Sequence, residues 1–110
     1  MLRIKMKILI IIIISLIFAA NENNHYAYID AIDQIQSLEE IAEKHLSLGD
    51  TINAINTLIE ITNYAELTPV YGDDFIAEKL YKIGQLFFLT DNHKSSETYL
   101  LLSIERYNQN

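Results

Sequence analysis

The sequence predicts an all-α chain that begins with a short hydrophobic segment. From Tyr26 onward, apolar residues recur at steps of three and four residues, which is the period of an amphipathic helix. Gly, Pro or clusters of polar residues separate the periodic stretches, and none alternates long enough with the two-residue period of a strand. With 110 residues, the chain is long enough for one small domain.

Residues 1–20 have the composition of an export signal. Three cations precede an uncharged run from Ile8 to Ala20, which ends in small residues. This pattern is typical of a secretory signal peptide. Neither candidate cleavage site at the end of this run fits the small-x-small pattern well, so an uncleaved membrane anchor is the alternative. The run is, however, shorter than the roughly 20 apolar residues that a membrane-spanning helix usually needs. Residues 1–20 are therefore predicted to be a signal peptide or signal anchor. Residues 21–110 are predicted to be an exported domain, which is periplasmic in a bacterium, secreted, or anchored to the inner membrane with the domain outside the cytoplasm.

The charge balance argues against two kinds of partner. Of the eight basic residues, three lie in the first 20 positions, whereas all 15 acidic residues lie beyond them, so the exported part carries five cations against 15 anions. This excess argues against nucleic acid and against an anionic membrane surface, and is compatible with a basic protein partner. The chain has no cysteine, so packing without disulfides must stabilise the domain.

Four helices are expected after a polar joint at Asn21 to Asn24. The first runs from Tyr26 to Leu48 and stops at Gly49, which suits a helix end. Its apolar positions are Tyr28, Ala31, Ile32, Ile35, Leu38, Ile41, Ala42 and Leu46.

The second helix follows a cap at Asp50 or Thr51. It gathers Ala54, Leu58, Ile61 and Ala65 on one strip, with Ile52, Ile55 and Ile59 on the adjoining strip. Because about half of its surface is apolar, we expect it to pack against more than one neighbour.

A loop from Glu66 to Asp74 contains Pro69 and Gly72, and its aspartates are predicted to cap the third helix, about Asp74 to Leu89. That helix carries Ile76, Leu80, Ile83, Gly84 and Phe87 on one side. A polar turn from Thr90 to Lys94 precedes the fourth helix, about Ser95 to Tyr107, with Ser96, Leu100, Ser103 and Ile104 expected to face inward.

The two halves of the domain correspond at a shift of 42 residues. The shift pairs Leu38 with Leu80, Ile41 with Ile83, Ala42 with Gly84, His45 with Phe87, Gly49 with Asp91, Ala54 with Ser96, and Leu58 with Leu100. These positions resemble the tetratricopeptide repeat (TPR), which has small residues where Ala42, Gly84, Ala54 and Ser96 stand and often a glycine where Gly49 stands. The spacing is similar to the longer variant of kinesin light chains.

The resemblance implies two helix hairpins, at about residues 35–68 and 77–110, which form a fragment of an α-α superhelix. The units depart from the family pattern: leucines replace its frequent tryptophan, Asp91 replaces the turn glycine, and the closing proline is not in its usual place. A generic four-helix bundle is the alternative. Repeat arrays usually need three or more units to bury a continuous core, and this chain has two. We therefore expect that the first helix covers an exposed end of the array, that the chain self-associates, or that it docks on a larger partner.

The resemblance further implies a protein-binding concave surface, formed by the first helix of each hairpin. Carried over by position, its residues are Gln36, Glu39, Glu43, Leu46, Glu78, Tyr81, Gln85 and Phe88. The set combines acidic residues with two aromatic rings, so we expect a basic or amphipathic protein segment as the partner. A solvated acidic face without a partner is the alternative.

No pattern points to an enzyme. The three histidines are widely separated, and no nucleophile elbow, phosphate-binding glycine loop or zinc-protease pattern occurs. Asp73 and Asp74 could join His93 around a metal, but adjacent aspartates at a helix start are more often caps. We therefore expect no catalytic residue, metal or cofactor, and a protein-interaction module; the alternative function is a small secreted bundle with a structural or inhibitory role.

Overall fold

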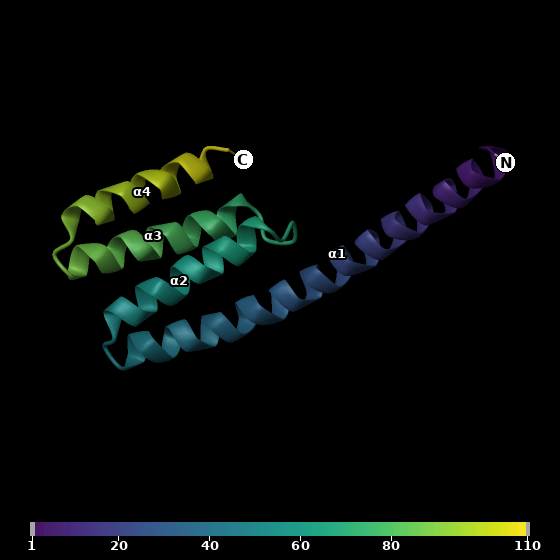
Figure 1. Ribbon diagram of the computed structural model, residues 1–110. Coiled ribbons are helices and arrows are strands. Elements are labelled where there is room, and N and C mark those ends of the chain that lie inside the picture. Colours follow the sequence, from purple (N-terminus) through teal and green to yellow (C-terminus); the bar gives the residue numbers. More distant parts are fainter. Residues whose placement is uncertain (1, 110) are drawn as a thin grey trace. The chain divides into compact units, whose positions relative to one another are not determined.

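A computed structural model shows four α-helices (Figure 1). The structure describes the backbone of residues 2–109 and the side chains of residues 6–13 and 29–109. The helices are α1 (Leu2–Ser47), α2 (Thr51–Glu66), α3 (Asp73–Leu89) and α4 (His93–Tyr107), and no strand occurs between residues 2 and 109. The prediction of an all-α fold is confirmed.

The first helix is much longer than predicted. The polar joint at Asn21 to Asn24 does not interrupt α1, because no Gly or Pro occurs before Gly49 to end a helix. The chain divides into two compact units, Met1–Asp30 and Ala31–Asn110, so the division lies inside α1 and beyond the predicted boundary at residue 20. No helix in the described part of the chain is long and apolar enough to cross a membrane. Within the predicted signal, the side chains of residues 1–5 and 14–20 lie outside the described part of the structure.

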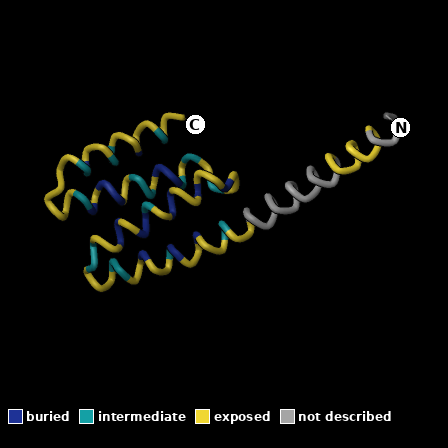
Figure 2. The backbone as a smooth tube through the Cα atoms, in the orientation of Figure 1, coloured by how far each residue is buried: buried dark blue, intermediate teal, exposed yellow. Residues whose placement is uncertain are grey.

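The core of the second unit lies among α1, α2 and α3 (Figure 2). It consists of Ile35, Leu38, Ala42, Ala54, Ile55, Leu58, Ile61, Ala65, Ile76, Ile83 and Leu86. Seven residues of α2 are buried, five of them on its predicted apolar strips together with Thr57 and Thr62, as expected for a helix with neighbours on two sides. The predicted inward position of Ile104 is wrong, and Ile41 and Ile52 on the predicted apolar strips are also exposed.

The fourth helix packs against α3 through small residues. Ser96 and Ser103 are buried, and their hydroxyl groups donate hydrogen bonds of 2.7 Å to the carbonyl oxygens of Gly84 and Ala77. A β-carbon built on Gly84 would lie only 2.7 Å from Leu100 Cδ2. Because Gly84 has no β-carbon, the side chain and the backbone nitrogen of Leu100 on α4 can lie directly against it.

The turns before α2 and before α4 adopt the same backbone conformation. Gly49 has a φ of +73°, and Asp91, its counterpart at the 42-residue shift, has a φ of 61°. This left-handed region is natural for glycine and tolerated by aspartate. Asp91 therefore adopts the same left-handed conformation at its turn as Gly49 does at the first.

The caps that follow these turns also correspond. The backbone N–H of Asp50 donates to the carbonyl of His45, and that of Asn92 to the carbonyl of Phe87, both at 2.9 Å. The side chains of Asp50 and Asn92 then each accept a hydrogen bond of 3.3 Å from the backbone N–H of the residue three positions later. The Asp50 cap predicted from the sequence is confirmed, and Asn92 is its equivalent at the start of α4.

Candidate functional site

A shallow hollow opens between α1, α2 and α3, with an apolar floor and charged walls. Its volume is about 210 Å³. The lining residues are Glu39, Ala42, Glu43 and Leu46 of α1, Leu58 and Ile61 of α2, and Lys79 and Lys82 of α3. Three of the four residues predicted from the first unit thus lie together, while exposed Gln36 does not line this hollow.

One wall of the hollow is fixed by an ion pair. Lys79 Nζ lies 3.3 Å from Glu39 Oε1 and 5.0 Å from the centre of the Phe75 ring. The Tyr71 ring packs against Phe75, with 4.5 Å between the centroids. Burial, and secondarily the nearby charge of Glu39, raise the pKa of the Tyr71 hydroxyl. Glu39 and Lys79 therefore help to hold α1 against α3, and less of their charge is available to a partner.

The other charges of this hollow remain open to solvent. Glu43 and Lys82 are both exposed, and neither takes part in an ion pair within the described residues. They present one carboxylate and one ammonium group at the rim above the apolar floor. The arrangement offers a partner complementary charges of both signs.

A second hollow, of about 470 Å³, opens on the exposed side of α3. It is lined by Tyr81, Lys82, Gln85, Leu86, Phe88 and Leu89, together with Leu100 of α4. Tyr81, Phe88 and Leu89 are largely exposed, and the Phe88 ring meets His93 edge-on at 5.0 Å between centroids. Three of the four residues predicted from the second unit line this hollow, whereas Glu78 is exposed outside it. Lys82 borders both hollows, so they meet on α3.

The sequence analysis missed Lys79 and Lys82. A signal for Lys82 was present, because Glu78, Lys82 and Gln85 are spaced four and three residues apart and thus share one strip of a helix. Lys79 could not be found in this way, because its place in the site depends on its contact with Glu39, forty residues earlier in the sequence. These lysines make the surface mixed in charge.

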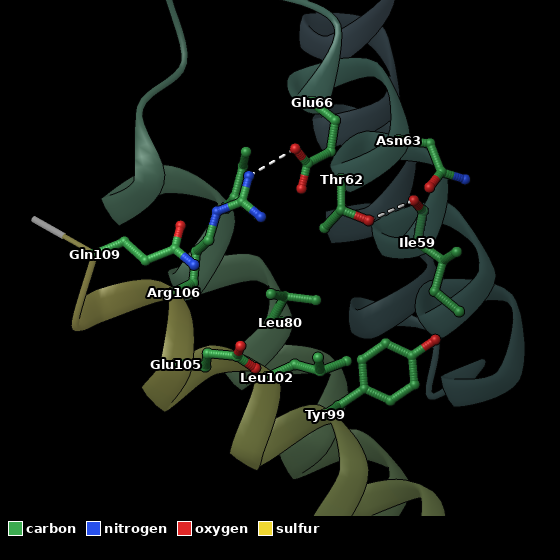
Figure 3. Close-up of a pocket in the computed structure, with 11 residues that line it drawn as sticks. Ile59, Thr62, Asn63, Glu66, Leu80, Tyr99, Leu102, Glu105, Arg106 and Gln109 are labelled. Atoms are coloured by element: carbon green, nitrogen blue, oxygen red, sulfur yellow. Dashed lines mark hydrogen bonds and ion pairs between the residues drawn. The ribbon is translucent and has the colours of Figure 1, made fainter.

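A third hollow, of about 370 Å³, lies between α2 and α4 (Figure 3). Arg106 at its edge donates hydrogen bonds of 2.6 Å to Glu66 and 2.8 Å to Asp73. These bonds, with the one to Glu66 foremost, raise the pKa of the Arg106 guanidinium. Because two carboxylates already neutralise Arg106, we assign it to joining α4 with the ends of α2 and α3.

The aspartates before α3 do not cap it in the predicted manner. The N-cap is Gly72, which has no capping side chain, while Asp73 and Asp74 lie in the first helical turn. Negative charge in that turn still stabilises the helix through its dipole. Within the described residues, no three His, Cys, Asp or Glu side chains are grouped so that they could hold a metal ion.

The partly buried histidine of the first turn has a local structural partner. His45 Nδ1 lies 3.7 Å from Asp50 Oδ2, across the turn between α1 and α2. The pKa of Asp50 is lowered, chiefly by the hydrogen bond from the Asn53 side chain, with a smaller contribution from His45. His45 and Asp50 therefore serve the turn.

Comparison with known proteins assigns no family. No protein-family model matches the chain, and no curated protein or solved structure gives a significant match. The resemblance to the tetratricopeptide repeat stays a prediction based on the residues quoted above.

Proposed function

We propose that the chain is an exported or membrane-anchored, non-enzymatic protein-interaction module of the tetratricopeptide type. The observation that carries this proposal is the correspondence of the two turns at a shift of 42 residues, in their positive φ, in their hydrogen bonds and in their caps. Short helix connections use only a few conformations, and this left-handed turn is a common helix end, so the correspondence gains its weight from occurring at the same 42-residue shift as the matched helix positions. The correspondence supports two repeated helix hairpins, at about residues 35–68 and 77–110.

The partner would lie along the exposed side of α3, across the two hollows. Over the aromatic hollow, Tyr81, Phe88 and Leu89 offer large apolar surfaces that favour apolar anchor side chains. Over the other hollow, Glu43 and Lys82 favour a segment that carries both a basic and an acidic group. The expected partner is thus an amphipathic protein segment, with the overall negative charge of the chain favouring a basic one.

The N-terminal segment supports export or anchoring. The described apolar side chains from Met6 to Ile13 are all exposed, and six of these eight residues are isoleucine or leucine. Such a surface is poorly compatible with water and suits either the apolar core of a signal or an anchor. N-terminal sequencing of the mature protein distinguishes the two: a start near residue 21 means a cleaved signal, and a start at residue 1 or 2 means an anchor.

The binding proposal is tested by selecting peptides from a random library with the full chain. We expect enrichment of segments that have apolar residues three or four positions apart next to basic residues. The double variant Tyr81→Ser/Phe88→Ser should lose this binding at least about tenfold, because truncating central aromatic contacts usually has the largest effect on affinity. Leu67→Ser is the control, since Leu67 is an apolar residue even more exposed than Tyr81 and Phe88 but lies outside both hollows. Equal loss in the control, or no enrichment at all, would contradict the proposal.

A further inference from the structure

The fourth helix exposes apolar side chains at positions that are covered in the second helix. At the shift of 42 residues, Leu101 corresponds to Ile59 and Ile104 to Thr62. Ile59 packs against the core and Thr62 is 7% exposed, and both border the hollow that α2 forms with α3 and α4. Leu101 and Ile104 have exposed fractions of 58% and 56%. The second hairpin therefore presents openly a surface that α3 and α4 cover on the first.

The two hollows of the proposed partner site correspond at the same shift. Four residues of α1 and α2 that line the smaller hollow have counterparts that line the aromatic one. The pairs are Glu39 with Tyr81, Glu43 with Gln85, Leu46 with Phe88, and Leu58 with Leu100. The smaller hollow is closed by Lys79 and Lys82 of α3, and no helix of residues 29–109 stands in that place at the aromatic hollow. We call the open surface the α3–α4 groove; its residues are Tyr81, Phe88, Leu100, Leu101 and Ile104.

We propose that the α3–α4 groove binds a basic amphipathic helix of another protein, seated as α3 is seated on α1 and α2. This inference rests on the proposed function and specifies its partner. Because α3 runs antiparallel to α2 (Figure 1), the bound helix runs antiparallel to α4. On its covered side α3 carries Ile76, Leu80, Ile83 and Phe87, at steps of four, three and four residues. The bound helix needs apolar residues at the first three of these positions.

Charge complementarity defines the fourth position of the bound helix. Ile55, which is 4% exposed, lines a hollow together with Phe87, and its counterpart on α4 is Glu97. Glu97 is exposed and takes part in no ion pair within the described residues. An apolar residue would remove water from this carboxylate without compensation, whereas Lys or Arg would pair with it. A cation at the place of Lys79 would also lie against the Tyr81 ring, which attracts it.

A second copy of this chain does not supply such a helix. In a head-to-tail stack of copies, α1 of the next copy would take the place of α3. Gln34 and Lys44 of α1 are the counterparts of Ile76 and Leu86, which are 3% and 5% exposed. Burial of the Gln34 amide against apolar side chains without a hydrogen bond is unfavourable. The outer side of α1 therefore suits water, and the occupant of the α3–α4 groove is a helix of a different protein.

A labelled peptide with the α3 sequence, residues 73–89, and the substitution Phe87→Lys carries the required pattern and serves as the probe. Its binding to the full chain is measured by fluorescence anisotropy, in a neutral detergent that keeps the N-terminal segment in solution. In the chain, Ile104→Asp should weaken binding at least about tenfold. Val70→Asp, at an exposed apolar position in the loop before α3, should leave it unchanged. A peptide with Phe87→Glu should bind at least about fivefold more weakly than the probe, and Glu97→Gln in the chain should abolish this difference.

Cross-linking tests the orientation, since the native chain contains no cysteine. Asn63 and Ile52, the counterparts of Glu105 and Lys94, line the hollows beside the first and the last turns of α3. With a short bismaleimide, a probe with an added N-terminal cysteine should therefore react at least about tenfold faster with Glu105→Cys than with Lys94→Cys. A C-terminal cysteine on the probe should reverse this preference.

The outcomes separate this inference from the proposed function. If Ile104→Asp leaves probe binding unchanged, or if both cysteine positions react equally, the seating is wrong, even where library peptides still require Tyr81 and Phe88. If neither the probe nor any library peptide binds, both proposals fall. A dimer of the chain in light scattering that Ile104→Asp dissociates would show that a second copy occupies the groove, which would also overturn the inference. Far-UV circular dichroism checks that each variant keeps its helices.

Discussion

Replacement of Gly84 by alanine tests the close approach of α3 and α4. The new β-carbon would lie 2.7 Å from Leu100 Cδ2, 2.8 Å from Leu100 Cγ and 3.2 Å from the Leu100 backbone nitrogen. Because the Leu100 nitrogen belongs to the backbone and Ser96 ties the Gly84 carbonyl to α4, the helices cannot easily separate. We expect the substitution to force Leu100 out of its place.

The expected loss is the difference between two opposing effects. Alanine in place of glycine inside a helix stabilises it by about 1 kcal/mol. Overpacking a close contact costs about 1–3 kcal/mol. The free energy of unfolding should therefore fall by roughly 1 kcal/mol in Gly84→Ala. In a Leu100→Ala background, where the nearest atoms are absent, the same substitution should instead be stabilising, by up to about 1 kcal/mol.

Urea unfolding of the full chain, followed by circular dichroism, measures these differences. The four proteins of the cycle give a coupling free energy between positions 84 and 100, expected to be about 1–2 kcal/mol. Gln85→Ala and Gln85→Gly, at the exposed neighbouring position, calibrate the alanine–glycine difference within α3 itself. If Gly84→Ala stabilises the otherwise unchanged chain, or if the two substitutions are simply additive, the close contact of the helices is not as described.

Four further substitutions test the two turns, the buried hydroxyl of Ser103 and the cap by Asp50. In urea unfolding, Asp91→Gly should raise the free energy of unfolding by about 0.5–1 kcal/mol, because glycine relieves the strain of the left-handed conformation. Gly49→Asp should lower the same free energy. If both substitutions raised it, the two turns would not be equivalent. Ser103→Ala should lower the same free energy by about 1 kcal/mol through loss of the hydrogen bond to Ala77, and an unchanged midpoint would exclude that bond. Because the pKa of Asp50 is lowered from its ordinary value of 3.8, its carboxylate stabilises the fold above that pH, and this effect is lost as the pH falls through the folded-state pKa. In acid, the free energy of unfolding of the wild type should therefore fall relative to that of Asp50→Asn. Parallel curves of this free energy against pH for the two proteins would refute the reasoning.

Much of the helix order could be read from local signals. Gly49, with the cap at Asp50, marks the first turn, and the polar turn beginning at Thr90 marks its counterpart. These features act within a few residues of chain, so the sequence is sufficient to locate them. The cap by Asp73 failed because α3 begins at Asp73 itself and its N-cap is Gly72, so the Asp73 carboxylate lies in the first turn, where it accepts a hydrogen bond from Arg106.

The candidate site could be predicted in part, because the repeat resemblance also relies on the positions of residues along the sequence. Position by position, the repeat resemblance selected Glu39, Glu43 and Leu46 for one hollow and Tyr81, Gln85 and Phe88 for the other. The resemblance supplied no information about which charges would pair across helices. The Lys79–Glu39 ion pair, which removes one carboxylate from the open surface, therefore became visible only in the packed structure.

The sequence by itself determined that this protein is helical. It also determined where three of the four helices begin and end, and which two turns correspond at a shift of 42 residues. These features follow from periodicity, glycine and helix caps, all of which act locally along the chain. Only the tertiary structure decided which strip of each helix is covered. On α4 the strip of small residues, Ser96 and Ser103, faces α3, and the larger Leu101 and Ile104 face outward. The reason is physical: Leu100 fills the space beside Gly84 that a β-carbon would take, and the two buried hydroxyls bond to the α3 carbonyls of Gly84 and Ala77, so close packing with satisfied hydrogen bonds prevails over the burial of Leu101 and Ile104.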